Sequence, residues 1–271
     1  MKTIYYNGAV YTGTLPLAQA FAVENGRFLF AGTNEEAKAL AADNDRLIDL
    51  GGRFVCSGFN DSHMHLLNYG NALHSALLSE HTGSLKELKD CFRSFMKEHP
   101  PKGNAWVIGR GWNQDYFSDV DRMPNRYDLD EISKDVPICA TRACGHCMVV
   151  NSKALEEAGI TKNTPQPEGG RIGIENGELD GRLFDNAMSL IHKAIPSPDK
   201  EQLKSMLISA IKKLNSYGIT SCQTDDYKVF QNVPWQTVNE AFHELEAEGA
   251  LTVRIYEQSN FHTPESLREF V

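Results

Sequence analysis

The sequence predicts an α/β protein that begins with a small β-rich unit. In residues 1–57, short apolar runs are separated by Asn-Gly and Gly-Gly pairs, and Asn-Gly between strand-like residues is the strongest short hairpin signal. From Pro198 onward the pattern becomes helix, strand, helix, strand, which is typical of parallel βαβ units. The two patterns indicate two regions, residues 1–57 and residues 58–271.

Periodicity and capping residues predict the individual elements. Ser84 is a predicted helix N-cap, because apolar residues recur at helical spacing after it (Leu85, Leu88, Phe92, Met96). The Gly- and Pro-rich residues 164–182 are predicted to form a long loop with a small hairpin. Further helices are expected at 152–159, 198–218 and 234–249, and strands at 105–112, 136–143, 218–226 and 251–260.

Composition excludes several classes of function. The net charge of −9, without any Lys/Arg run, argues against a nucleic-acid or anionic-membrane partner. No apolar run approaches the roughly 18 residues that a membrane span requires, and the opening residues lack an apolar leader segment. We therefore expect a cytoplasmic protein whose six cysteines are reduced thiols.

The stretch SGFNDSHMHLL, residues 57–67, contains two histidines one residue apart. In a strand, residues i and i+2 point to the same face, so the imidazoles of His63 and His65 can converge on one metal ion. Asp61 lies on the same alternation. The alternative is that the pair is a chance occurrence in a loop, because an isolated H-x-H often arises by chance.

The residues around this pair resemble the opening motif of the metal-dependent amidohydrolase superfamily. Residues 51–65, GGRFVCSGFNDSHMH, follow G-x-x-V-x-P-G-F-x-D-x-H-x-H, with Ser57 where proline is usual. Four later stretches resemble, in the same order, the YtcJ-like branch that includes N-substituted formamide deformylases. They are GRGWNQDYF, RYDLDEISKDVPICATRACGHCMVVNSKALEEAGI, PEGGRIGIENGELDGRLFDNA and NSYGITSCQTDD, so the resemblance covers essentially the whole chain.

The resemblance implies part of a (β/α)8 TIM-like barrel. Its first three strands or so would lie in residues 58–271, with an inserted α/β region at about 80–197. Residues 1–57 would contribute to a β-sandwich. His63 and His65 would be ligands of a divalent metal, usually zinc, which polarises a carbonyl and lowers the pKa of water to about 7. The implied reaction is hydrolysis of a non-peptide, amide-type C–N bond in a small molecule.

The resemblance also implies that part of the site is missing. In the superfamily the other ligands and the general-base Asp come from later strands, which would lie beyond Val271. Catalytic zinc normally has three protein ligands and a water, so two histidines alone would hold it weakly. We therefore expect a truncated chain that is inactive alone and that associates into a homo-oligomer through exposed sheet edges. A non-catalytic fragment that only binds or associates is the alternative.

Several polar residues are candidates for substrate binding. Trp112, Asn113 and Gln114 follow a predicted strand in a loop that could line a pocket, beside Arg110. By the resemblance, His146 in the segment G-H-x-x-x-x-N-S lies near the substrate or metal, and a packed structural histidine is its alternative. Arg142 is expected to pair with a substrate carboxylate or with a structural Asp. Asp225 and Asp226 are expected to lie at the rim of the site or to act as caps.

A different chemistry is suggested by Cys144-Gly-His-Cys147. CGHC is a dithiol motif of disulfide oxidoreductases, and there it opens a helix. Here MVVNS follows it, which favours a strand. Thiol–disulfide exchange is thus a remote alternative. The remaining histidines are expected to be ordinary surface or packed residues: His74, His81, His99, His192, His243 and His262.

Overall fold

The computed structural model describes residues 1–230, 232–261 and 263–271. The chain divides into two compact units. The first unit comprises residues 1–61 together with 218–221, and the second comprises residues 62–217 and 222–271. The α/β class predicted from the sequence is confirmed, with several sheets and no closed barrel among the described residues.

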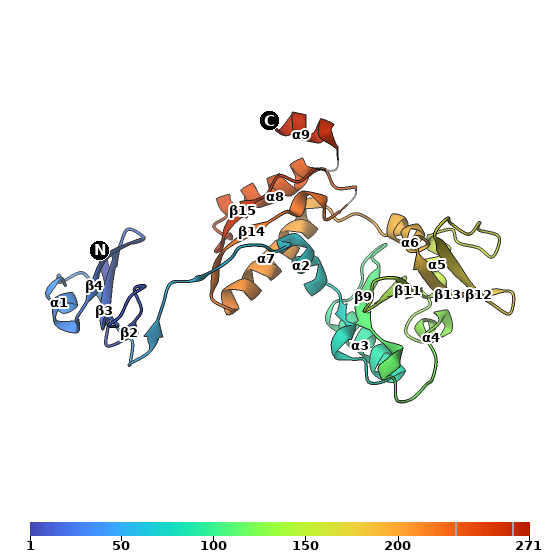
Figure 1. The fold of residues 1–271 in the computed structure, drawn as a ribbon, viewed down its shortest axis with the longest axis horizontal. Coiled ribbons are helices and arrows are strands. Elements are labelled where there is room, and N and C mark those ends of the chain that lie inside the picture. Colours follow the sequence, from blue (N-terminus) through green and yellow to red (C-terminus); the bar gives the residue numbers. More distant parts are fainter. Residues whose placement is uncertain (231, 262) are drawn as a thin grey trace. The chain divides into compact units, whose positions relative to one another are not determined.

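The first unit is built on a mostly antiparallel four-stranded sheet in the order β4-β3-β1-β5, whose strands are blue in Figure 1. Only β1 and β5 run parallel. Its core is formed by Ile4, Ala20, Ala22 and Ala37. The elements are β1 (Lys2–Tyr6), β2 (Ala9–Val10), β3 (Ala20–Glu24), β4 (Arg27–Gly32), α1 (Asn34–Ala39), β5 (Arg46–Asp49), β6 (Phe54–Val55) and β7 (Phe59–Asp61).

The predicted turn signals have different outcomes in this unit. Asn25-Gly26 forms the tight turn between β3 and β4, with both residues at positive φ, as a two-residue hairpin requires. Asn7-Gly8 also turns the chain, but it does not form a hairpin. Strand β1 pairs instead with β3 and β5, and β2 pairs with β6. Strand pairing here depends on distant partners that local turn residues do not encode.

The second unit contains a six-stranded sheet in the order β12-β13-β11-β10-β9-β8, drawn in green to yellow in Figure 1. Strands β8, β9 and β10 are parallel, and the others pair antiparallel. The Gly- and Pro-rich segment contains the predicted hairpin, β12–β13, which is longer than expected because Ile172 and Leu183 are buried in the core. The strands are β8 (Ala76–Leu77), β9 (Val107–Trp112), β10 (Ile138–Arg142), β11 (Cys147–Val150), β12 (Gly170–Glu175) and β13 (Glu178–Asp185).

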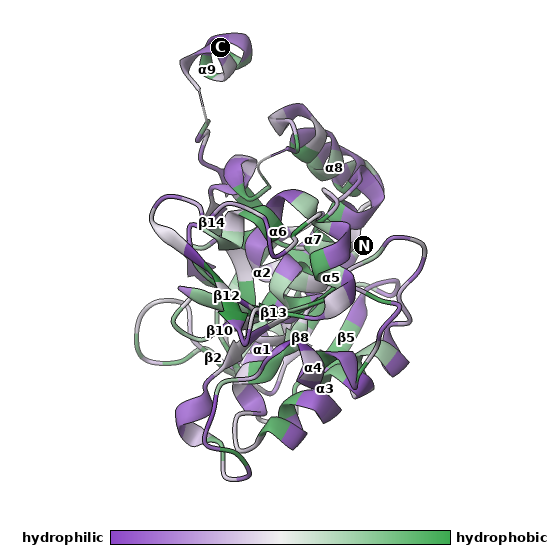
Figure 2. Cartoon of the chain, turned by 90° about the vertical axis from the view of Figure 1, so that its right-hand side faces the viewer, coloured by the Kyte–Doolittle hydropathy of each residue, from purple (hydrophilic) through white to green (hydrophobic). Residues whose placement is uncertain are grey.

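Four helices in this part of the second unit pack against that sheet or against one another. Ser84 caps α3 by accepting the Glu87 N–H, as predicted, and Leu88 and Phe92 of this helix are buried. In Figure 2, α3 and α8 show hydrophobic and hydrophilic residues in alternating bands, as expected for helices with one buried side. The helices are α3 (Leu85–Glu98), α4 (Arg126–Asp130), α5 (Ser152–Glu157) and α6 (Met188–Ala194).

The remaining elements include the strand end that positions the candidate site. Helix α2 packs along α7, and α7 packs against α8. Strands β15, β14 and β7 are neighbours in a three-stranded sheet, and Cys222–Thr224 of β14 belong to the second unit. The elements are α2 (Leu66–Leu73), α7 (Lys200–Ser216), β14 (Ile219–Thr224), α8 (Trp235–Ala247), β15 (Arg254–Glu257) and α9 (Pro264–Phe270).

Candidate active site

His63 and His65 lie next to each other in the connection that leads into α2. Their ring centroids are 5.3 Å apart and the rings are tilted by 76°. The predicted placement of the pair within a strand is wrong. Strand β7 ends at Asp61, and His65 is the N-cap of α2. The chain leaves the extended conformation before the pair because the helix begins directly after it, yet the two imidazoles still meet.

Asp225 orients the imidazole of His65. Its Oδ1 contacts Nδ1 of His65, and the Asp225 side chain is only 20% exposed. A carboxylate accepts hydrogen bonds, so the neutral imidazole donates from Nδ1 and keeps its lone pair on Nε2. Histidines that bind metals typically show this arrangement, in which a carboxylate holds the nitrogen that does not face the metal. The sequence indicates Asp225 as a rim residue but does not predict this partner.

Two further carboxylates lie directly behind this contact. Asp226 is fully buried, and burial raises the pKa of its carboxyl to about 6. Glu257 is partly buried, and this burial together with the nearby Asp226 carboxylate raises the pKa of Glu257 to about 8. The Asp226 N–H donates to Oε1 of Glu257 at 2.6 Å, whereas the buried Oε2 of Glu257 has no hydrogen-bond partner among the described residues. Sequence reasoning missed Glu257, which gives no local signal.

The structure brings together three of the residues predicted to bind substrate. Arg142, at the end of β10, donates from Nε to Oε1 of Gln114 and from Nη2 to Oδ1 of Asn113, both at 2.8 Å. It also forms an ion pair with Asp115 at 3.0 Å. Arg142 thus fixes the conformation of the 113–115 loop through its own contacts. A role of these residues in substrate binding stays a prediction.

The other two predicted substrate residues lie in contrasting environments. Trp112 is fully buried, and its indole N–H donates to the Ala140 carbonyl at 2.9 Å. It therefore packs in the core of the six-stranded sheet. His146 is 79% exposed in its side chain, and its Nδ1 pairs with Asp185 at 3.2 Å. The structure leaves the exposed ring of His146 accessible to a ligand.

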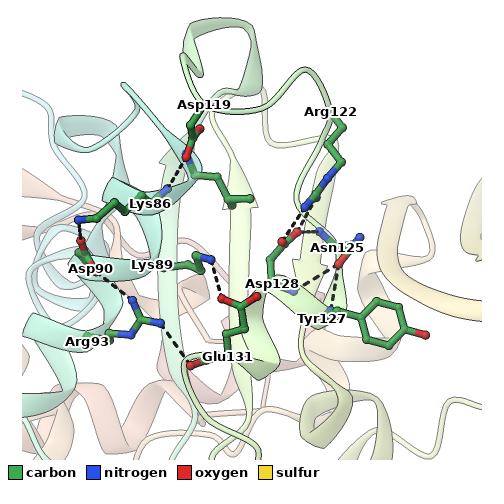
Figure 3. Close-up of polar contacts among 11 residues, drawn as sticks. Lys86, Lys89, Asp90, Arg93, Asp119, Arg122, Asn125, Tyr127, Asp128 and Glu131 are labelled. Atoms are coloured by element: carbon green, nitrogen blue, oxygen red, sulfur yellow. Dashed lines mark hydrogen bonds and ion pairs between the residues drawn. The ribbon is translucent and has the colours of Figure 1, made fainter.

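The loop of residues 117–123, which follows the 113–115 loop in sequence, forms hydrogen bonds with α3 and α4 (Figure 3). Asp119 accepts the backbone N–H groups of Leu85 and Lys86 at the start of α3. Arg122 binds both oxygens of the buried Asp128, at 2.6 and 2.8 Å. Residues 114, 115 and 117–123 line a cavity of about 610 Å³. These contacts make the loop a defined wall of that cavity.

The CGHC segment lacks the context that a dithiol enzyme needs. It forms the turn between β10 and β11, with Gly145 at a φ of 77°, and no helix begins there. Cys144 is exposed, whereas Cys147 is buried and burial raises its pKa to about 12. A thiol with such a pKa is a poor partner for disulfide exchange at neutral pH. This arrangement disfavours the thiol–disulfide alternative.

The remaining histidines have ordinary surroundings where they are described. His74 bonds Ser209, His99 stacks on Phe95 and His243 lies 3.9 Å from Glu246. His262 lies outside the described residues. In the part of the chain that the structure describes, no three His, Cys, Asp or Glu side chains gather to hold a metal ion. The same residues include no helix long and apolar enough to cross a bilayer.

Comparison with known proteins identifies the family. The amidohydrolase family model matches residues 46–271, and the chain belongs to this family. It is 36% identical over 240 residues to the putative amidohydrolase YtcJ of Bacillus subtilis (strain 168), a match that covers 86% of this chain and 44% of that protein. It is 33% identical over 179 residues to N-substituted formamide deformylase of Arthrobacter pascens, covering 65% and 32%.

Solved structures agree with this assignment. The chain matches an uncharacterized metal-dependent hydrolase from Pyrococcus furiosus with a TM-score of 0.70 and 26% identity, over 95% of this chain and 50% of that one. An uncharacterized metal-dependent hydrolase from Pyrococcus horikoshii OT3 gives 0.72 and 25%, over 100% and 50%. The chain therefore spans half the length of these structures and less than half the length of the two curated relatives.

Proposed function

We propose that the protein acts as a metal-dependent hydrolase of non-peptide, amide-type C–N bonds. The observation that carries this proposal is the contact between Asp225 and Nδ1 of His65, beside the ring of His63. It gives the histidine pair the orienting carboxylate that metal-binding histidines typically have. Family membership and the similarity to metal-dependent hydrolases support the same conclusion.

The residues of the pair fit a divalent ion, for which we propose zinc. His63 and His65 would supply imidazole nitrogens, which zinc binds well, and Asp225 would hold His65 in the correct tautomer. A divalent ion at this position would polarise an amide carbonyl and activate water. The chain itself orients these ligands and excludes water from the carboxylate of Asp226 behind them, since Asp226 is fully buried.

The sheet order supports the finer fold proposal. In the three-stranded sheet β14 lies between β7 and β15, so these strands lie side by side in the order in which they occur along the chain, as the first three strands of a (β/α)8 barrel would. The histidine pair and Asp225 then follow β7 and β14 at their C-terminal ends, where barrel enzymes place their active sites. On this proposal, residues 1–57 belong to a β-sandwich, and the six-stranded sheet is an insertion into the barrel.

We propose a small amide as substrate, because one relative is named N-substituted formamide deformylase. A polar cluster that suits an amide is formed by Asn113, Gln114 and Arg142. The other two proposed substrate residues are Trp112, directly before Asn113, and His146, four positions after Arg142. A cytoplasmic location is proposed from the free thiols of all six cysteines. Homo-oligomer formation is proposed from the exposed apolar side chains of the first unit, which include Phe28, Phe54 and Phe59.

The non-catalytic alternative is favoured by one observation, the absence of a third ligand gathered with the pair among the described residues. Release of formate or amine from N-substituted formamides, measured with added Zn²⁺, separates the two proposals. Contrary to the inactivity expected from two histidine ligands alone, hydrolysis by this chain predicts turnover that a chelator removes and Zn²⁺ restores. Zn²⁺ binding without any turnover across a panel of amides would contradict hydrolysis by this chain and support the alternative.

A further inference from the structure

A buried hydrogen-bond network connects the end of β14 to the first turn of α2. The Leu66 N–H donates to Oγ1 of Thr224 at 2.8 Å, and the Leu67 N–H donates to Oδ1 of Asp226 at 2.9 Å. The Thr224 hydroxyl donates to Oδ2 of Asp226, also at 2.8 Å. Thr224 is 1% exposed and Asp226 is fully buried, so water does not replace these partners.

The network provides a cap that the helix does not supply for itself. His65 is the N-cap of α2, and its side chain makes no capping hydrogen bond. The first N–H groups of a helix need acceptors from elsewhere. Here Thr224 and Asp226 accept the N–H groups of the two residues that directly follow His65.

The same strand end therefore contacts both the ring and the backbone of the histidine segment. Asp225, between the two capping residues, contacts the His65 imidazole. The Met64 N–H donates to the Gln223 carbonyl at 3.0 Å, which fixes the residue between the two histidines. Residues 64 to 67 are thus held by four consecutive residues of the other segment, 223 to 226.

We propose that Thr224 and Asp226 are positioning residues for the His63–His65 pair. This inference rests on the proposed function, in which the pair binds a divalent metal. The two residues act through the backbone of the first turn of α2, which sets the direction in which His65 leaves the helix. Neither residue is proposed as a metal ligand or as a group that touches substrate.

The alternative is that the network only stabilises the fold. Both explanations predict a loss of stability when the network is broken, so stability alone does not distinguish them. A positioning role adds two consequences. The geometry of the two rings changes when the Thr224 hydroxyl is removed, and affinity for a metal falls, whereas removal of a helix-cap hydroxyl in the first unit leaves both unchanged.

The test uses Thr224→Val, which removes the hydroxyl at nearly constant volume, and Thr224→Ser, which keeps it. Thr33→Val is the matched control, because Thr33 caps α1 of the first unit through the same kind of hydroxyl contact. NMR measures the ring–ring nuclear Overhauser effect between His63 and His65 and the amide exchange of Leu66. Equilibrium titration with Zn²⁺ measures affinity, and circular dichroism confirms folding.

We expect T224V to accelerate Leu66 exchange, to weaken or abolish the ring–ring effect and to lower Zn²⁺ affinity by about tenfold. T224S should restore all three, and T33V should change none. An unchanged ring–ring effect in folded T224V overturns the inference. If the unmodified chain binds no Zn²⁺ but the ring–ring effect still depends on Thr224, the proposed metal function fails while the positioning of the pair stands.

Discussion

Asp225 contacts His65 across 160 positions of sequence, and this contact joins the end of β14 to the start of α2. The two residues belong to segments that are separated by the whole six-stranded sheet along the chain. Their meeting converts a short histidine motif into an oriented pair. This contact and the groups around it determine how the protein should respond to substitution.

Replacing Asp225 with Asn should weaken metal binding without unfolding the protein. An amide can donate to Nδ1 as well as accept from it, so the tautomer of His65 is no longer fixed. Loss of such a carboxylate typically costs 10- to 100-fold in metal affinity, roughly the effect we expect for Zn²⁺ in a chelator competition. Asp185→Asn is the matched control, since Asp185 pairs with the exposed His146. Equal losses in both variants would contradict a special role for Asp225.

Glu257→Gln should make stability less sensitive to pH. The folded-state pKa of Glu257 is about 8, raised from an ordinary 4.5 by burial and by Asp226. Its stabilising contribution is therefore complete below pH 4.5 and is lost as pH rises through about 8. Gln resembles the protonated form and cannot lose that proton.

As the pH rises from about 5 to about 8, the unmodified protein should therefore lose unfolding free energy relative to E257Q. One pKa unit corresponds to about 1.4 kcal/mol, and the partial exposure of Glu257 reduces the full effect of its raised pKa. We therefore expect this relative loss of unfolding free energy to be roughly 2 kcal/mol. Urea denaturation at several pH values measures it, with exposed Glu178→Gln as the control. A parallel pH profile for E257Q and the unmodified protein would show that the Glu257 carboxyl is not desolvated.

Gly70→Ala should destabilise the second unit. A Cβ at Gly70 would lie 2.3 Å from the Met206 carbonyl oxygen, because α2 and α7 approach closely at this point. Overpacking of this kind costs about 1–3 kcal/mol, which exceeds the helix propensity of about 1 kcal/mol gained by alanine. Thermal unfolding measures the change, and Asn68→Ala on the exposed side of α2 is the control. A G70A protein more stable than the parent would disprove the close contact.

Replacing Arg142 should lower the reactivity of the Cys144 thiol toward alkylation. The His146 backbone N–H and the Arg142 guanidinium lower the pKa of Cys144, and the thiolate is the reactive form. Alkylation by iodoacetamide at about pH 7, followed by peptide mass mapping, should label exposed Cys144 and spare buried Cys139 and Cys147. Arg142→Met should slow labelling of Cys144 and leave that of exposed Cys56 unchanged. Equal rates at Cys144 in both proteins would contradict this assignment.

Local patterns predict the elements that are determined locally. The apolar stripe after Ser84 identifies this residue as the cap of α3. The helix expected at 198–218 is α7, which ends just before Gly218, a residue with a φ of 76°. Asn25-Gly26 is predictable because its turn geometry depends on two residues alone. The histidine pair is recognisable from its motif, although the strand predicted for it is wrong.

The features that sequence could not supply are contacts between distant segments. Burial decides whether Asp226 is a surface cap or a buried acceptor, and burial depends on how α2 and β15 pack over it. The partners of Arg142 come from a loop 28 and 29 positions earlier. Glu257 gives no signal in its own neighbourhood. Only the folded chain shows these relationships.

The central claim is that His63 and His65 together bind a divalent metal. Equilibrium dialysis against Zn²⁺, with zinc measured by mass spectrometry, tests it most directly. The unmodified chain should hold about one more zinc per chain than the His63→Asn/His65→Asn variant. A His99→Asn/His243→Asn variant, matched in the number of histidines removed, should retain it. Equal zinc content in the unmodified chain and the His63/His65 variant would contradict the claim.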